Sequence, residues 1–84
     1  MTRFYFDTNV GDRTERDTEG VDLPSEARAL AEAKAALTDM ARDHLPNGDH
    51  IGFRVTVRDA TGEEIYYASL VMDAGPTPSK RRPS

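Results

Sequence analysis

Residues 7–12 (DTNVGD) carry oxygen-bearing side chains in a pattern that invites comparison with a calcium-binding loop. An EF-hand calcium loop needs oxygen ligands at its first, third and fifth positions, glycine at the sixth and glutamate at the twelfth. Counted from Asp7, the fifth position is Gly11, the sixth is Asp12 and the twelfth is Thr18. The flanking residues also favour strands over helices. The spacing therefore favours a solvated turn over a calcium site.

Two histidines, His44 and His50, lie on either side of a predicted helix end, and Asp49 lies beside the second. Zinc sites use three or four Cys, His or carboxylate ligands at recurring spacings. The chain has no Cys and only these two His, and no third ligand is fixed at such a spacing. We therefore expect no metal site and no cofactor.

The serine and glutamate side chains show no arrangement typical of catalysis. A nucleophile needs a base and an orienting group within reach. Ser25 is better explained as a helix cap and Ser69 as a strand residue. Glu63 and Glu64 are neighbours in a predicted strand, so they point to opposite faces. No glycine-rich phosphate loop is present, and we expect a protein that is not an enzyme and has no catalytic residues.

One amphipathic helix, at about residues 25–44, is the strongest structural signal in the chain. Ser25 can cap its start, and Glu26 lies at the positive end of the helix dipole. Residues 46–49 (PNGD) end it. Apolar residues at spacings of three and four predict one buried stripe. The stripe consists of Ala27, Leu30, Ala33, Leu37, Met40 and Ala41.

A predicted hairpin follows the helix. Residues 51–58 alternate apolar and polar, residues 59–62 (DATG) suit a tight turn, and residues 63–73 form the returning strand. The register of the returning strand stays open, since a slip of one residue exchanges its two faces. One register turns Ile65, Tyr67, Ser69 and Val71 inward, and the other turns Tyr66, Ala68, Leu70 and Met72 inward.

The N-terminal residues favour a strand at 4–6, a turn at 9–12, a loop or weak edge strand at 13–17 and a short strand at 18–23.

The order β-β-α-β-β predicts an α+β fold, a two-layer sandwich of one helix on a short antiparallel sheet. We expect one domain at residues 1–73 and a disordered Pro/Ser/basic tail at 74–84. The predicted core consists of Phe4, Phe6, Val21, Leu23, Ala27, Leu30, Leu37, Met40, Ile51, Phe53, Val55 and Val57.

A single helix covers one face of a sheet, so the opposite face is the candidate binding surface. Tyr and Arg are the residues enriched at interface hot spots. The predicted face carries Tyr5, Arg54, Thr56, Arg58 and Tyr67, with Ile65 beside them. The alternative interpretation is a wet face on which the arginines pair with acids.

Composition narrows the choice of partners. Without Lys80, Arg81 and Arg82, the 11 basic residues fall to 8 against 15 acidic ones, a net charge of −7. A phosphate backbone attracts clustered Lys and Arg, so we do not expect nucleic-acid binding. No stretch is apolar enough to span a membrane, and the N-terminus lacks the features of a signal peptide. We expect a cytoplasmic protein without a membrane partner.

The chain resembles a family of short bacterial proteins of unknown function that is abundant in rhizobia and related alphaproteobacteria. The resemblance lies in residues 3–6 (RFYF), in residues 17–24 (DTEGVDLP) with the Ala-rich helix after them, and in residues 55–62 (VTVRDATG). It implies that Tyr66, Ala68 and Leu70 point inward, although Glu64 departs from the family's apolar pattern. Asp7 stands where the family often has His. The element order also resembles HicB-type antitoxin domains at the level of the fold.

These patterns predict a non-catalytic binding or self-associating module that uses the open sheet face or an edge strand. A protein partner or a second copy in a homodimer is the expected occupant. A nucleic-acid-linked regulator of the antitoxin type is the first alternative, and a small-ligand carrier or enzyme is the second.

Overall fold

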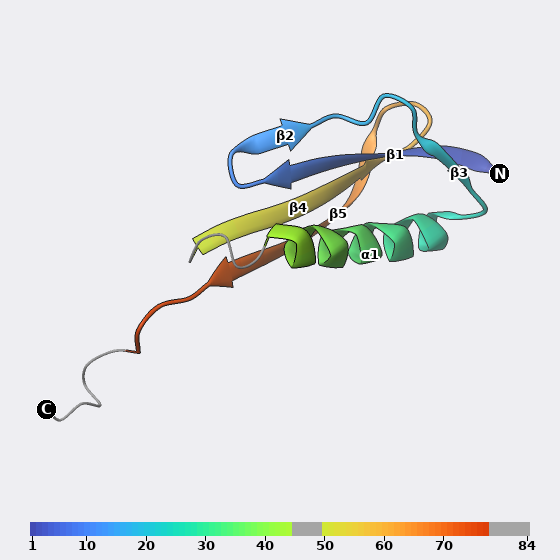
Figure 1. Cartoon of the computed structure of the whole chain (residues 1–84). Coiled ribbons are helices and arrows are strands. Elements are labelled where there is room, and N and C mark those ends of the chain that lie inside the picture. Colours follow the sequence, from blue (N-terminus) through green and yellow to red (C-terminus); the bar gives the residue numbers. More distant parts are fainter. Residues whose placement is uncertain (45–49, 78–84) are drawn as a thin grey trace, which may run out of the picture.

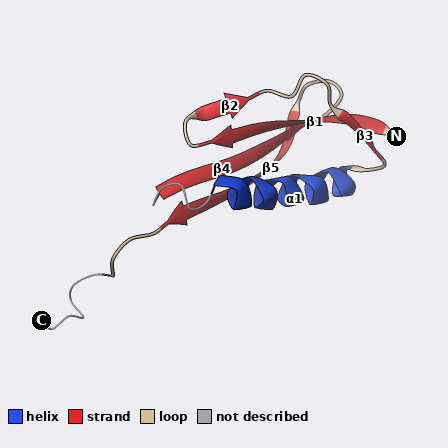
Figure 2. Cartoon of the chain, in the orientation of Figure 1, coloured by secondary structure: helices blue, strands red, loops and turns tan. Residues whose placement is uncertain are grey.

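The computed structural model describes residues 1–44 and 50–77. Figure 1 shows one helix lying along one face of an antiparallel sheet, and Figure 2 distinguishes this helix from the strands and loops. The fold is α+β, as the sequence predicts, with the order β-β-β-α-β-β. The elements are β1 (Thr2–Val10), β2 (Arg13–Glu15), β3 (Val21–Leu23), α1 (Glu26–His44), β4 (His50–Arg58) and β5 (Glu64–Asp73).

The sheet has β1 and β4 at its centre and a different arrangement at each side. Its order is β2-β1-β4-β5, and β3 also pairs with β1. The two short strands share the outer edge of β1: β3 pairs with Thr2–Phe4 and β2 with Thr8–Val10. The segment that the sequence left as a loop or weak edge strand therefore contains β2, which is the additional strand.

Helix α1 begins as the sequence predicts, but it is rotated relative to the predicted stripe. The backbone N–H of Arg28 donates to Ser25 Oγ at 3.1 Å, which satisfies one of the free donors of the first turn. The buried helix residues are Ala29, Ala33, Leu37 and Ala41, at spacings of four. Ala27 is exposed, so its assignment to the core is wrong. The helix lies mainly on β4 and β5, and small alanines at its centre let it approach them closely.

The hairpin between β4 and β5 confirms the predicted turn and selects one of the two registers. Asp59 Oδ1 accepts hydrogen bonds from Thr61 and Glu63, and Gly62 adopts a φ of 93°, which suits glycine. Tyr66, Ala68, Leu70 and Met72 lie opposite Val57, Val55, Phe53 and Ile51. Paired residues share a face, so these side chains lie on the helix side, as the family resemblance implies.

The buried core lies between α1 and the sheet. Its residues are Phe4, Leu23, Ala29, Ala33, Leu37, Ala41, Phe53, Val55 and Val57. Phe6, Met40 and Ile51 pack against this core while partly exposed. Val21 is 42% exposed, so its assignment to the core is wrong: β3 lies at the edge, where α1 covers little of it. Ile65 also packs against the core, because a β-bulge at this end of β5 turns it away from the predicted open face.

No helix among residues 1–44 and 50–77 is long and apolar enough to cross a membrane. The predicted helix stop at residues 46–49, the candidate metal ligand Asp49 and the basic residues 80–82 lie outside the described residues.

Candidate functional site

The strand register gathers most of the predicted binding residues on the sheet face opposite α1. Tyr5 lies opposite Arg58, Thr56 lies between Asp7 and Tyr67, and Arg54 lies between Asn9 and Ser69. Since directly paired residues share a face, Tyr5, Arg54, Thr56, Arg58 and Tyr67 are on one side of the sheet. Their surroundings differ sharply from one end of this face to the other.

Arg58 is buried and held by an ion pair with Asp7. Its Nε donates to Asp7 Oδ2 at 2.8 Å, and its Nη2 donates to Asp7 Oδ1 at 3.0 Å. Arg58 is 7% exposed and Asp7 is 8% exposed. The hydrogen bonds from Arg58 are the main reason why the pKa of Asp7 lies below its ordinary value of 3.8, although burial opposes them. The arrangement is a bidentate pair across β1 and β4.

Asp17 fastens the segment between β2 and β3 to this ion pair. Its carbonyl oxygen accepts a hydrogen bond from Arg58 Nη2 at 2.8 Å, and its N–H donates to Asp7 Oδ1 at 3.0 Å. Its carboxylate accepts the N–H of Phe6 at 3.0 Å, in the gap between β2 and β3, and the N–H groups of Glu19 and Gly20. Burial alone raises the pKa of Asp17, but these three donors hold it below 3.8.

Gly20 allows the same segment to lie in close contact with the sheet, because a larger residue would not fit there. A Cβ atom there would lie 2.9 Å from the Phe4 carbonyl oxygen and from the Tyr5 ring, and its φ is +72°. The Tyr5 ring in turn lies 4.9 Å from the Arg58 guanidinium. Residues 16–20 thus cover this end of the face. Arg58 is therefore not part of an exposed binding surface, and the sequence could not show this because the contacts join distant parts of the chain.

The other end of the face is open. The guanidinium of Arg54 lies 4.0 Å from the centre of the Tyr67 ring, a cation–π contact. Arg54, Tyr67 and Ser69 are exposed, and Thr56 is partly buried. This exposed part borders β5, so the surface available to a partner lies at one side of the sheet.

Strand β5 forms that side, and it exposes apolar side chains on both of its faces. Tyr67 is 59% and Val71 is 62% exposed on the open face. On the helix face Leu70 is 45% and Tyr66 is 37% exposed. Residues 65–72 contain no charged side chain and no proline. Among the described residues, no strand pairs with the outer edge of β5.

An edge strand is among the surfaces expected from the sequence, but β5 was not identified as that strand, although the apolar character of residues 65–72 can be seen in the sequence. A strand with one wet face alternates apolar and polar residues, as β4 does. Strand β5 does not alternate in this way, because seven of the eight residues at 65–72 (IYYASLVM) are apolar or aromatic. In a strand that one helix covers on a single face, a non-alternating apolar run indicates exposed apolar side chains on the uncovered face.

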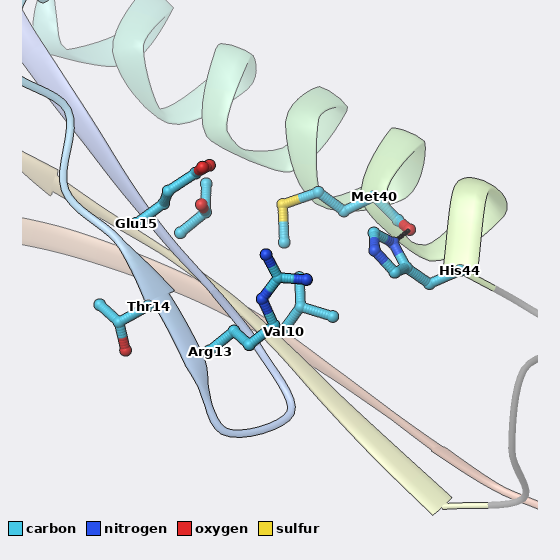
Figure 3. A pocket seen from close by; sticks show the side chains of 7 residues that line it. Val10, Arg13, Thr14, Glu15, Met40 and His44 are labelled. Atoms are coloured by element: carbon cyan, nitrogen blue, oxygen red, sulfur yellow. Dashed lines mark hydrogen bonds between the residues drawn. The ribbon is translucent and has the colours of Figure 1, made fainter.

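A cleft on the helix side, between α1 and β2, is a weaker candidate (Figure 3). It has a volume of about 340 Å³ and is lined by Val10, Arg13, Met40 and His44, among others. His44 Nδ1 lies 2.9 Å from the carbonyl oxygen of Met40. Because a carbonyl oxygen only accepts, Nδ1 carries the proton in this contact. The lining mixes two threonines, one arginine, one glutamate and one histidine with the apolar side chains of Val10 and Met40, so it indicates no single class of ligand.

The residues considered from the sequence as possible metal ligands do not form a cluster among the described residues. Asp7 lies in β1 and pairs with Arg58. His50 Nδ1 lies 3.6 Å from Asp73 Oδ1, and both side chains are largely exposed. Across residues 1–44 and 50–77, no three His or carboxylate side chains are placed to hold one ion.

Comparison with known protein families gives a match over residues 3–71 to a domain of unknown function (DUF6894). Neither the curated proteins nor the solved structures contain a match to the chain. The matched residues run from β1 through nearly all of β5, so they include the whole helix and both sides of the sheet. Because this match spans most of the sequence, the chain belongs to the DUF6894 family of domains of unknown function.

Proposed function

We propose that this domain is a non-catalytic protein-binding module that accepts an extended segment along the free edge of β5. One observation carries the proposal: between its terminal Glu64 and Asp73, β5 is uncharged and mainly apolar, exposes side chains on both faces, and has an outer edge that no described strand pairs with. An unprotected strand edge offers a row of free N–H and C=O groups to another chain. Proteins that bind by strand addition use these groups for affinity and alternate side chains for specificity.

The exposed side chains of β5 supply the apolar contacts that such a segment needs. A bound strand would lie beside Tyr67 and Val71 on one face and beside Tyr66 and Leu70 on the other. Arg54 stacks on Tyr67 and places a cation next to this edge. Large exposed apolar patches on monomeric proteins commonly mark interaction sites.

The edge is a better candidate than the centre of the open face. Arg58 is buried, and its Nε and Nη2 donors are already used by Asp7 and Asp17. The ionisable groups with lowered pKa values are used in the same way: Asp7 and Asp17 hold the strands and the segment between them, and Asp59 holds the hairpin turn. These groups therefore act in the scaffold.

A selection from displayed random 12-residue peptides tests the proposal. We expect enriched peptides to be rich in β-branched and aromatic residues, and to bind Val71→Lys at least about tenfold more weakly, which corresponds to about 1.4 kcal/mol. Thr18→Lys is the matched control, because it adds the same charge at an exposed site near the opposite edge. Peptides that bind Val71→Lys and the unmodified chain equally, or an absence of enrichment, would contradict the proposal.

A further inference from the structure

The regular part of β5 has similar side chains on both sides of Ser69. The three residues before it (YYA) and the three after it (LVM) are all uncharged and apolar or aromatic. The β-bulge lies between the pairs Arg58–Glu64 and Val57–Tyr66, so it displaces Ile65. Beyond it, residues 66–72 pair regularly with β4 and carry no charge, and Asp73 ends the strand. Ser69 is the middle residue of this regular stretch. Its neighbours two positions away are Tyr67 and Val71, the most exposed large side chains of the strand.

We infer that the occupant of this edge is a second copy of the chain, with the two β5 strands antiparallel about a two-fold axis at Ser69. This inference rests on the proposed function and names the partner. A two-fold interface uses the same patch on both copies, so the patch must be complementary to itself. The axis must be perpendicular to the sheet, because directly opposite residues of antiparallel strands share a face.

Pairing about Ser69 covers the exposed side chains on both faces. On the open face Tyr67 of each copy lies opposite Val71 of the other, an aromatic–β-branched pair of the kind that stabilises sheets. On the helix face Tyr66 lies opposite Met72, and Ala68 lies opposite Leu70. The two Ser69 hydroxyl groups meet at the axis, where they can hydrogen-bond.

The neighbouring register is less favourable for two independent reasons. Centring the pair on Ala68 brings the bulged Ile65 into the ladder, where a bulge disrupts regular pairing. It also brings the carboxylates of Glu63 and Glu64 of each copy next to the Val71–Asp73 end of the other, where they meet apolar side chains and a like charge. The register centred on Ser69 leaves both the bulge and these carboxylates outside the paired stretch.

The position of α1 is compatible with this pairing. The helix lies mainly on β4 and β5, and the two-fold axis keeps both helices on the same side of the joined sheet. With strands about 4.8 Å apart, helices lying over the gap between β4 and β5 would be about 10 Å from each other. Packed helices have interaxial distances of about 8–10 Å, and Leu70 and Tyr66 would fill the space between them.

Cysteine cross-linking at the axis tests this register directly, because the chain has no cysteine of its own. Opposite residues of antiparallel strands have Cα atoms about 4.5–5.5 Å apart, within the range that a disulfide spans. Under a glutathione redox buffer, we expect Ser69→Cys to form a covalent dimer at least about tenfold faster than Val71→Cys, because paired thiols react at a high effective concentration. Val71→Cys is the matched control, since it is exposed on the same face but does not meet itself.

Charge substitutions at the opposite positions provide a second readout. The double variant Tyr67→Lys with Val71→Lys places like charges opposite each other, and we expect its dimer dissociation constant to rise by about tenfold or more. The double variant Tyr67→Lys with Val71→Glu places opposite charges there, and we expect it to dimerise more tightly than the double-lysine variant. Analytical ultracentrifugation measures both, and circular dichroism establishes that both fold.

The outcomes separate this inference from the proposed function. Equal cross-linking of Ser69→Cys and Val71→Cys, or a monomeric native chain at millimolar concentration, overturns the pairing of two copies. If selected peptides still lose affinity for Val71→Lys in that case, β5 accepts a strand from another protein and the proposed function stands. If they do not, both proposals fail.

Discussion

The two sides of the sheet in this domain are built in opposite ways. At the outer side of β1, the strands β2 and β3 are short, and Asp17 fills the gap between them by accepting the N–H of Phe6. At the other side, β5 is long and uncharged between residues 65 and 72, and no described strand pairs with its outer edge. Natural sheets commonly protect their edges with short strands, charges and covering loops. The side of β1 shows these devices and β5 lacks them, which is why we assign binding to β5.

The largest expected effect comes from removing the charge that anchors the protected side. We expect Asp7→Asn to destabilise the fold by about 3 kcal/mol, because it leaves a buried guanidinium without its counter-charge. Urea unfolding followed by circular dichroism measures the difference. Asp22→Asn is the control: Asp22 pairs with Arg3 on the surface, where both side chains are about half exposed, and such pairs contribute less than about 1 kcal/mol. Equal losses in the two variants would contradict the contrast between buried and surface pairs.

A somewhat smaller effect is expected from uncovering the gap between β2 and β3. Asp17→Ala removes the acceptor of three backbone N–H groups, at Phe6, Glu19 and Gly20. Unsatisfied, partly buried donors of this kind destabilise a protein by about 1–3 kcal/mol. We also expect faster amide hydrogen exchange in residues 16–20, while exchange in β4 does not change. An Asp17→Ala variant with unchanged exchange in residues 16–20 would show that Asp17 does not hold this segment.

The pH dependence of the stability should show the contribution of the Asp7 and Asp17 carboxylates. The folded pKa values of Asp7 and Asp17 lie below 3.8, so their contribution is complete above the unfolded value of about 3.9 and is lost as the pH falls through the folded values. We therefore expect the stability difference between the native chain and Asp7→Asn to narrow as the pH falls from 6 towards 3. Urea unfolding at several pH values measures it. A difference that widens below pH 4 has the wrong sign for this account.

The smallest effect is expected on the open part of the sheet. Arg54→Ala removes the guanidinium that lies 4.0 Å from the Tyr67 ring. Exposed cation–π contacts contribute about 0.5–1 kcal/mol, so we expect a loss of that size in urea unfolding. Arg54→Lys keeps the charge and should retain part of the contact. A loss as large as that of Asp7→Asn would mean that Arg54 supports the fold in a way that the structure does not suggest.

The parts of the fold that follow from local chemistry could be predicted from the sequence. Ser25 caps the helix, Asp59 and Gly62 form the hairpin turn, and the alternating residues of β4 place Phe53, Val55 and Val57 in the core. The helix rotation could not be predicted, because alanines occur on several sides of α1 and both Ala27 and Ala29 suit an apolar stripe.

The candidate site was predicted only in part, because its decisive contacts join distant residues. Arg58 and Asp7 are 51 positions apart, and no sequence pattern shows that they meet or that residues 16–20 cover them. Tyr67 and Arg54 are exposed on the predicted face, whereas the edge beside them depends on the strand order, in which β5 comes last.

Amide hydrogen exchange at two protein concentrations tests the central claim most directly. Peptides from β5 and from β1 are compared in the same sample, once at about micromolar and once at about millimolar concentration. We predict that exchange in β5 slows at the higher concentration because its free N–H groups gain a partner, while exchange in β1 does not change. Exchange that slows in β1 and not in β5 would show that the binding edge is on the other side of the sheet.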